Sequence, residues 1–236
     1  MAQLDGHPVV SRAQWLEARK ALMKREKELT RLRDELAEAR RALPWVRVDK
    51  PYAFDGPHGR ESLADLFAGK SQLLVYHFMF PASWQEGCKS CSFWMDGFEP
   101  MAVHLAARDV ALAVVSIAPF AKLDAFRQRM RWSFHWVSSA PSDFNRDFGV
   151  SISAEERAER RPVYNFGSSP FGVEEAPGLS VFHRDAQGAI FHTYSVYARG
   201  LDPLNTAYQL LDLVPKGRDE AGLAYPMEWV RHRDRY

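Results

Sequence analysis

The sequence is short of several features that would identify its class at once. It holds only two cysteines in 236 residues, and 31 Lys and Arg balance 30 Asp and Glu to a net charge of +1. This balance argues against a nucleic-acid partner, because such partners select a basic excess. No apolar run approaches the ~18 residues of a membrane span, so we expect no membrane partner. With 46% hydrophobic and 13% aromatic residues, the chain is also too apolar to be disordered.

The beginning of the chain predicts its compartment. The first residues, MAQLD, contain no basic region followed by an apolar stretch, so we expect no secretory signal and a cytoplasmic protein. Thiols stay mostly reduced in the cytoplasm. The two cysteines, Cys88 and Cys91, therefore do not suit a structural disulfide. A local redox pair or half of a metal site remains for them.

Residues 1–44 predict an N-terminal helical arm. Ser11 and Gln14 form the pattern of a capping box, and Pro44 ends the helix. Apolar residues recur every seven positions among Lys, Arg and Glu; they are Trp15, Leu22, Leu29, Leu36 and Leu43. This narrow stripe either packs on the protein's own domain or joins two copies in a homodimer.

Residues 45–236 predict one α/β domain. Apolar strands are expected at 72–80 and 110–117, and an aromatic-rich strand at 133–139. The later elements are helices at 92–108, 119–130 and 201–213, a hairpin formed by 179–184 and 189–195, an excursion loop at 151–177, and a tail without clear period at 215–236. Strands that alternate with helices predict a mixed central sheet with helices on its faces.

The pattern Cys88-Lys89-Ser90-Cys91 is a C-x-x-C between a buried strand and a helix. Free amides and the positive dipole at a helix start stabilise a thiolate. We expect Cys88, nearer these amides and nearer solvent, to be the nucleophile, with Lys89 as a nearby cation. Cys91, one turn later, is in reach to close a disulfide and release a bound partner.

Other uses of these residues stay open. The two cysteines could only pack as small buried residues, or they could bind a metal with His183 or His192, which flank the hairpin turn. His77, inside a buried strand, is interpreted as a core histidine. Four aromatic residues near one strand are interpreted as core packing, with a substrate groove as the alternative; they are Trp132, Phe134, Trp136 and Phe144.

The sequence resembles the thioredoxin-like superfamily. Residues 59–76, GRESLADLFAGKSQLLVY, look like the entry segment of the peroxiredoxin branch, and residues 81–88, PASWQEGC, look like its loop to the peroxidatic cysteine. More closely, residues 15–236 resemble a bacterial group of thioredoxin-like proteins classified as a domain of unknown function. The passages that carry this are YHFMF at 76–80, CKSCSFW at 88–94, SDFN at 142–145 and WVRHRDRY at 229–236. The resemblance implies a thioredoxin-like fold of peroxiredoxin type, with no established reaction.

Three positions depart from the patterns of these relatives. The peroxiredoxin branch has Thr or Ser three residues before its cysteine, where this chain has Gln85. That branch also has an Arg before the late strand, which residues 177–182 lack. The cis-proline of thioredoxins corresponds to Leu179, with Pro177 two residues early. These departures leave the expected fold unchanged. They argue against assigning the activity of thioredoxins or of peroxiredoxins from the resemblance alone.

We therefore predict a thiol–disulfide oxidoreductase over residues 45–236 that needs no cofactor and no metal. Cys88 attacks a protein or small-molecule disulfide or peroxide, and Cys91 resolves the mixed species. One alternative is a thiol peroxidase that uses the same two residues. The other is a non-catalytic thioredoxin-fold binding or scaffold protein, in which the arm forms a homodimer and the aromatic residues bind a partner.

Overall fold

A computed structural model describes residues 2–4 and 6–236, with side chains from Gly6 onward. Residues 1 and 5, in the stretch where we expect no secretory signal, lie outside the described part. The chain divides into two compact units, Met1–Pro44 and Trp45–Tyr236. Among the described residues, no helix is both long enough and apolar enough to cross a membrane.

The first unit contains a short strand pair and a long helix. β1 (Ala2–Leu4) pairs antiparallel with β2 (His7–Val9), a hairpin that the sequence analysis did not predict. α1 (Arg12–Arg41) follows, and the predicted capping box is present. The Gln14 amide donates to the Ser11 hydroxyl at 3.3 Å, and the Ser11 amide donates to Gln14 Oε1 at 3.1 Å. No side chain of α1 is buried.

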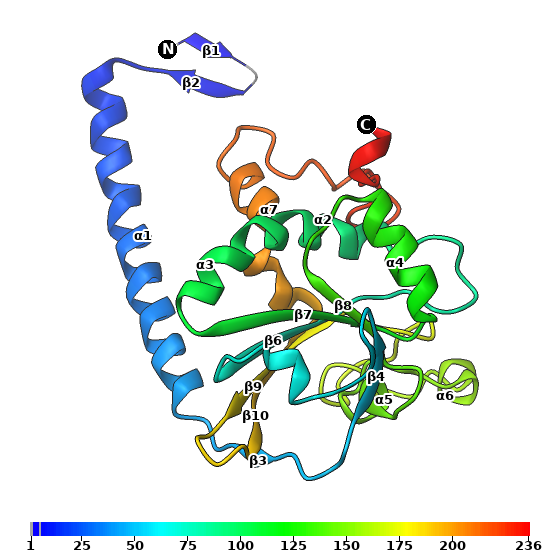
Figure 1. Ribbon diagram of the computed structural model, residues 1–236. Coiled ribbons are helices and arrows are strands. Elements are labelled where there is room, and N and C mark those ends of the chain that lie inside the picture. Colours follow the sequence, from blue (N-terminus) through cyan, green and yellow to red (C-terminus); the bar gives the residue numbers. More distant parts are fainter. Residues whose placement is uncertain (1, 5) are drawn as a thin grey trace. The chain divides into compact units, whose positions relative to one another are not determined.

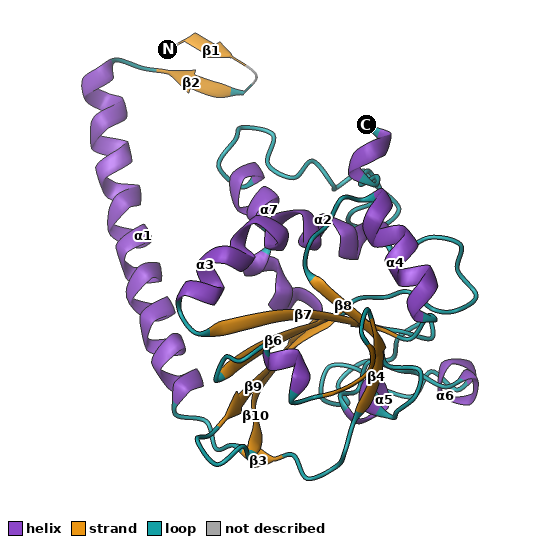
Figure 2. Cartoon of the chain, in the orientation of Figure 1, coloured by secondary structure: helices purple, strands orange, loops and turns teal. Residues whose placement is uncertain are grey.

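The second unit is built on one eight-stranded mixed sheet in the order β3-β10-β9-β6-β7-β8-β4-β5 (Figures 1 and 2). The strands are β3 (Val46–Arg47), β4 (Ala53–Gly56), β5 (Gly59–Ser62), β6 (Gln72–His77), β7 (Val110–Ser116), β8 (His135–Ser138), β9 (Gly178–Arg184) and β10 (Ile190–Tyr197). β6, β7 and β8 run parallel, and β9 pairs antiparallel with both β6 and β10. Leu74 faces Leu112 on one side and Val181 on the other.

Helices connect the parallel strands. The α-helices are α2 (Lys89–Phe98), α3 (Ala102–Ala107), α4 (Phe120–Arg129), α5 (Phe144–Asp147), α6 (Ala154–Ala158) and α7 (Thr206–Leu211). The 3₁₀ segments are η1 (Asp65–Phe67), η2 (Glu99–Met101), η3 (Ala198–Leu204) and η4 (Arg233–Arg235). β6, α2, β7, α4 and β8 in sequence, followed by the β9–β10 hairpin, form the thioredoxin-like arrangement that the sequence predicts.

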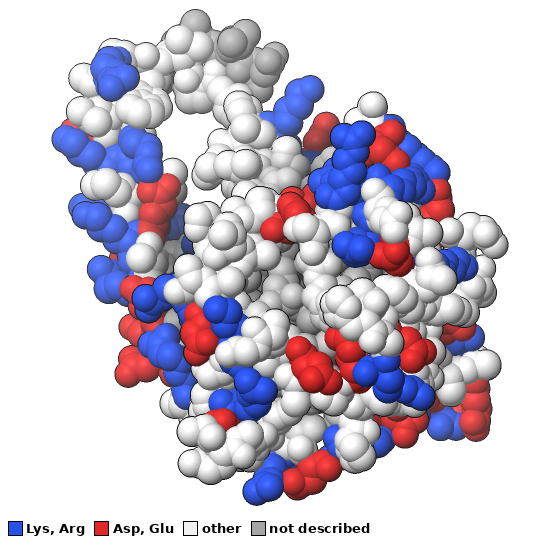
Figure 3. All heavy atoms as spheres, viewed as in Figure 1, with Lys and Arg blue, Asp and Glu red and all other residues white. Residues whose placement is uncertain are grey.

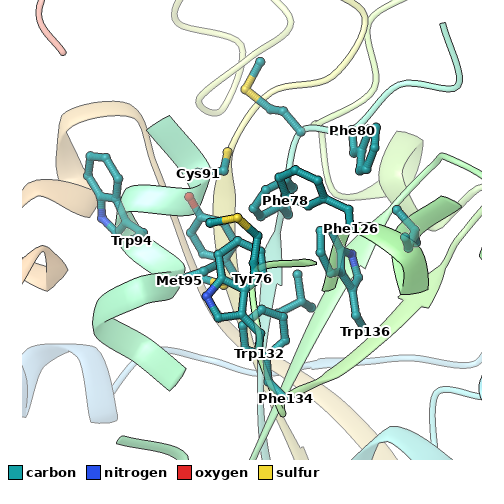
Figure 4. Packing of buried hydrophobic residues seen from close by; sticks show 14 of the residues in the cluster. Tyr76, Phe78, Phe80, Cys91, Trp94, Met95, Phe126, Trp132, Phe134 and Trp136 are labelled. Carbon is teal, nitrogen blue, oxygen red and sulfur yellow. The ribbon is translucent and has the colours of Figure 1, made fainter. Parts of the chain in front are cut away.

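Strand β6 sends alternate side chains into two separate cores, as the period of a strand requires. Leu73 and Val75 pack with Phe144 of α5 on one face. Tyr76 packs with residues of α2 and α4, such as Met95 and Phe126, on the other face (Figures 1 and 4). The sheet is therefore covered on both faces, which explains the nearly continuous apolar sequence of its central strands.

Two predicted helices have different bounds in the structure. The helix expected at 92–108 begins at Lys89 and changes to the 3₁₀ segment η2, because Pro100 has no amide hydrogen for a helical bond. The first part of the helix expected at 201–213 is replaced by η3, which contains Pro203. Only α7 remains α-helical there, and Asn205 caps it by accepting the Tyr208 amide at 3.0 Å.

Gly87 lies in a place without room for a side chain. A Cβ added to it would lie 2.7 Å from Phe78 Cε1 and 2.8 Å from Phe126 Cε1. We expect Gly87→Ala to lower the free energy of unfolding by about 1–3 kcal/mol through overpacking, measured by urea unfolding. Gly172→Ala is the control, because its Cβ would meet nothing within 4 Å. Equal stability of the two variants would contradict the close packing around Gly87.

Candidate functional site

Cys88 and Cys91 lie at the start of α2, just past the end of β6. The Cys88 amide donates to the Met79 carbonyl at 3.1 Å, which ties the approach to the helix to the chain leaving the strand. Cys88 is the N-cap residue of α2, and the helix begins at Lys89. Both cysteines are free thiols. The structure therefore brings the two predicted site residues together within one helical turn.

The Cys88 sulfur takes the place of a capping oxygen. The Cys91 amide donates to Cys88 Sγ at 3.5 Å. The Cys91 thiol, followed by the amides of Cys91 and Ser90 and the Ser90 hydroxyl, lowers the pKa of Cys88 to about 7 against the opposing effect of burial. This is the stabilisation expected for a thiolate at a helix start.

The pKa of Cys91 is shifted in the opposite direction. The residue is 2% exposed, and burial, followed by the neighbouring Cys88 sulfur, raises the pKa of the Cys91 thiol well above its usual range. Near neutral pH, Cys88 is thus the more ionised of the two, and Cys91 carries its proton. Two chemically identical residues acquire different properties because hydrogen bonds at the helix start prevail at Cys88, whereas burial prevails at Cys91.

Tyr76 is a site residue that the sequence analysis did not single out. Its hydroxyl acts to lower the pKa of the Cys91 thiol. Burial raises the pKa of Tyr76 itself well above its usual range, so the hydroxyl stays protonated and can donate. Figure 4 shows Tyr76 beside Cys91 in the core. Because side chains alternate between the two faces of a strand, the sequence of β6 could have predicted that Tyr76 lies on the face covered by α2.

Both thiols line a cavity of about 910 Å³ within the second unit. Tyr76 and Trp94 contribute to its wall from β6 and α2. Two segments that are distant from the cysteines in sequence complete the cavity wall. The loop at 151–177 supplies Tyr164, Phe171 and Pro177, and the tail at 215–236 supplies Arg218, Glu220, Tyr225, Pro226 and Met227. Neither segment was predicted to reach the cysteines.

Lys89 faces the tail. Its ammonium group donates to the Glu228 carbonyl at 2.7 Å and lies 5.6 Å from the centroid of the Tyr225 ring. The structure thus gives Lys89 a further role beside the one predicted for it. It ties the start of α2 to the segment that closes one side of the cavity.

The histidines considered as metal ligands lie elsewhere. The ring centroids of His183 and Trp45 are 5.0 Å apart, and His192 Nε2 lies 2.8 Å from the Ser195 hydroxyl. Neither histidine lines the cavity that holds the cysteines. Within the described part of the chain, no group of three or more His, Cys, Asp or Glu residues could hold a metal ion.

His77 lies in the core, on the opposite face of β6 from Tyr76. Its Nε2 lies 2.8 Å from the Ser180 hydroxyl, and burial lowers the pKa of His77 to about 3. The aromatic residues considered for a groove are also buried. Trp132, Phe134 and Trp136 belong to the core on the α2 face, and Phe144 belongs to the core on the other face.

Glu175 is a second residue that the sequence analysis missed. It is 2% exposed, and its carboxyl group accepts hydrogen bonds from the Phe80 amide at 2.7 Å, the Ile117 amide at 3.0 Å and Asn145 Nδ2 at 2.8 Å. Burial raises the pKa of Glu175 to about 8. The residue joins the loop at 151–177 to the chain leaving β6 and β7. No local sequence signal marks it.

On the face of the molecule drawn in Figure 3, no large area carries charges of a single sign. Figure 3 shows Lys and Arg interspersed with Asp and Glu. The basic residues at the end of the tail take part in this mixing. Arg233 pairs with Asp96 at 3.3 Å, and Asp234 pairs with Arg129 at 2.8 Å.

None of the curated proteins matches the chain. Among solved structures, it is similar to peroxidoxin BcpB of Mycobacterium tuberculosis, with 13% identity over 71% of this chain and 97% of that chain and a TM-score of 0.46. It is also similar to peroxiredoxin Q of Xanthomonas campestris, with 12% identity over 71% of this chain and 94% of that chain and a TM-score of 0.45.

The sequence comparison covers nearly the whole chain. Residues 4–236 match the profile of a family described as "Bacterial protein of unknown function (DUF899)". The match includes the C-x-x-C, both loop segments of the cavity wall and most of the N-terminal unit. The chain therefore belongs to this bacterial family, DUF899.

Proposed function

We propose that this protein is a thiol–disulfide oxidoreductase with Cys88 as the nucleophile and Cys91 as the resolving thiol. The observation that carries the proposal is the contrast between the two thiols one helical turn apart. The pKa of Cys88 is lowered to about 7, whereas burial raises the pKa of Cys91. The thiolate is the reactive form of cysteine, so Cys88 is prepared to attack near neutral pH.

The reaction proceeds in two exchanges. The Cys88 thiolate attacks one sulfur of a disulfide, the substrate S–S bond breaks, and the first leaving sulfur departs as a thiolate. Cys91 gives its proton to that thiolate, attacks Cys88 Sγ and releases the second substrate sulfur, which takes a proton from solvent. Two electrons pass from the pair to the substrate, and a Cys88–Cys91 disulfide remains. The Tyr76 hydroxyl supports the Cys91 thiolate as it forms.

A thiol of the cell must then restore the pair. We propose that the protein works in the cytoplasm, where dithiol reductants are abundant. The reductant attacks Cys91 or Cys88, and its own two thiols become a disulfide. The peroxidase alternative would use the same cysteines. Gln85, which stands where peroxiredoxins carry Thr or Ser, is exposed and does not line the cavity. We therefore favour disulfide exchange.

Variants of the two cysteines separate their roles. On treatment with excess hydroxyethyl disulfide, the wild-type protein should lose the mass of two hydrogens. Cys91→Ser should instead gain the mass of one substrate half and stop there, and Cys88→Ser should do neither, as read by intact mass spectrometry. Dithiothreitol should reverse both changes. Unimpaired reaction of Cys88→Ser would overturn the assignment, and Cys88-dependent consumption of hydrogen peroxide without disulfide exchange would favour the peroxidase.

The pH dependence of Cys88 alkylation tests the stabilised thiolate. The rate with iodoacetamide should rise with pH, because the thiolate fraction grows, and should reach half its maximum at about pH 7. Cys91→Ala removes the strongest hydrogen-bond donor to Cys88, so the midpoint should move upward. Gly97→Ala in the same helix is the control, because its added Cβ makes only ordinary contact. A wild-type midpoint in the usual thiol range of about 8.5 would refute the interpretation.

We also infer that α1 joins two copies of the chain. Its leucines at seven-residue intervals are half exposed, as Leu22 at 50% and Leu29 at 48% illustrate. Such a seam is buried when two helices pair.

A double substitution in the seam tests this inference. Leu22→Glu with Leu29→Glu places like charges in the seam, so the mass measured by light scattering should fall from that of a dimer to that of a monomer. Lys27→Glu, on the polar side of the helix, should leave the dimer intact. A wild-type chain that is monomeric at high concentration would rule the dimer out.

A further inference from the structure

The structure assigns a substrate class to the pair. We propose that Cys88 and Cys91 reduce a small, uncharged disulfide with aromatic or apolar substituents, which binds in the cavity of about 910 Å³. This inference rests on the proposed function and makes it more specific. It distinguishes a small-molecule reductase from an enzyme that acts on protein disulfides or on charged thiol metabolites.

The size and position of the cavity favour a small molecule. Sites for small ligands commonly enclose roughly 300–1,000 Å³, a range that includes this cavity. Cys91 is buried and Cys88 is only partly exposed, and both line this cavity. The loop at 151–177 and the tail at 215–236 supply other parts of its wall. These segments restrict the approach of a disulfide on the surface of a folded protein to Cys88.

The wall is lined with aromatic rings. Tyr164 and Phe171 form a pair with ring centroids 4.9 Å apart. Trp94, Tyr208 and Tyr225 face the same cavity from α2, α7 and the tail. Aromatic faces and edges bind other aromatic groups through offset or edge contacts. Rings from separate segments of the chain are thus positioned around a substrate that approaches the thiols.

The charged residues of the wall are already paired. Arg218 lies over the Tyr208 ring at 3.9 Å and donates to both carboxyl oxygens of Asp212 at 2.8 Å. Its remaining nitrogen donates to Asp202 at 3.1 Å, which also accepts from Arg199 at 3.3 Å. The cations therefore point at carboxylates of the same wall.

The Glu220 carboxylate also has its hydrogen-bond partners within the protein. Its Oε1 accepts from the Tyr208 hydroxyl at 2.8 Å, the Trp229 indole at 2.7 Å and the Met227 amide at 2.9 Å. Apart from the Cys88 thiolate, the ionised groups of the described wall are two arginines and three carboxylates, so their formal sum is −1. An anionic disulfide would meet no spare cation there, whereas an uncharged one would avoid the cost of desolvating a charge.

The overall reaction is balanced within the pair and its substrate. One reduced protein and one molecule R–S–S–R give the Cys88–Cys91 disulfide and two molecules of R–SH. The two thiol protons of the protein end on the two products, and the two electrons that reduce the substrate come from the two protein thiols as they form the new S–S bond. A dithiol reductant then returns the protein to its reduced state.

Reaction rates with two aromatic disulfides test the charge preference. Dithiodipyridine is uncharged at neutral pH, whereas dithiobis(nitrobenzoate) carries two negative charges. Each rate constant with the reduced full-length protein is divided by the rate constant with dithiothreitol, which removes the intrinsic reactivity of the disulfide. We expect this ratio to be at least tenfold higher for dithiodipyridine. Equal ratios, or a preference for the anion, would overturn the proposal.

Two matched pairs of variants test the wall. Tyr225→Ala and Phe171→Ala remove rings from the cavity, and Tyr236→Ala and Phe166→Ala remove exposed rings that do not line it. The readout is the rate with dithiodipyridine relative to that with hydroxyethyl disulfide. We expect the cavity variants to lower this selectivity about tenfold, equal to about 1.4 kcal/mol, and the controls to leave it unchanged. Equal selectivity in all four variants would contradict the proposal.

A binding measurement separates this proposal from the proposed function. Dipyridylethane has two carbons in place of the two sulfurs, so it can bind but cannot react. Calorimetry with the Cys88→Ser, Cys91→Ser double variant, its fold checked by circular dichroism, should show one site that Tyr225→Ala weakens about tenfold. Absent binding, while wild-type protein still reduces hydroxyethyl disulfide, would overturn the substrate class alone. Failure to reduce any disulfide would overturn the proposed function and the substrate class with it.

Discussion

The amide groups at the first turn of α2 point toward the sulfur of Cys88, and the chemistry of the site depends on this arrangement. Residues 78–87 connect β6 to this helix start, with the Cys88 amide held by the Met79 carbonyl. Gly87 allows the close approach, because any side chain there would enter the space of Phe78 and Phe126. A helix that began one turn later would leave Cys88 outside its first turn and without the amide of Cys91.

The burial of Cys91 is the second feature on which the proposed mechanism depends. Cys91 lies one turn into the helix, where it meets Tyr76 and the core on the α2 face of the sheet. The same fold that exposes one sulfur to the helix amides thus encloses the other. In the proposed reaction, desolvation keeps the enclosed thiol protonated until Cys88 has reacted, and the Tyr76 hydroxyl offsets part of that cost when the second thiolate forms. The proposed order of the two exchanges follows from this difference.

Two segments with little regular structure, which contain only the short helices α6 and η4, complete the space in front of the thiols. Glu175 ties the loop at 151–177 to the ends of β6 and β7 through three hydrogen bonds. The tail is fixed where His232 Nε2 lies 2.9 Å from the Gly87 carbonyl, immediately before Cys88, and where Lys89 holds Glu228. These contacts carry little periodic signal, because each is a single side chain reaching a few specific groups. They nevertheless fix the two segments that line the cavity together with the pair.

The sequence by itself determined the elements whose causes are local. The capping box of α1 follows from Ser11 and Gln14, the buried strands from their apolar runs, and the site from the spacing of Cys88 and Cys91. The same local pattern predicted Cys88 as the nucleophile, but only the tertiary structure decided how strongly the core desolvates Cys91. It also decided what faces them, because Tyr164 and Tyr225 reach the cavity from segments far away along the chain. Periodicity reports which face of an element is apolar, but contacts between distant irregular segments are settled only when the whole chain has packed.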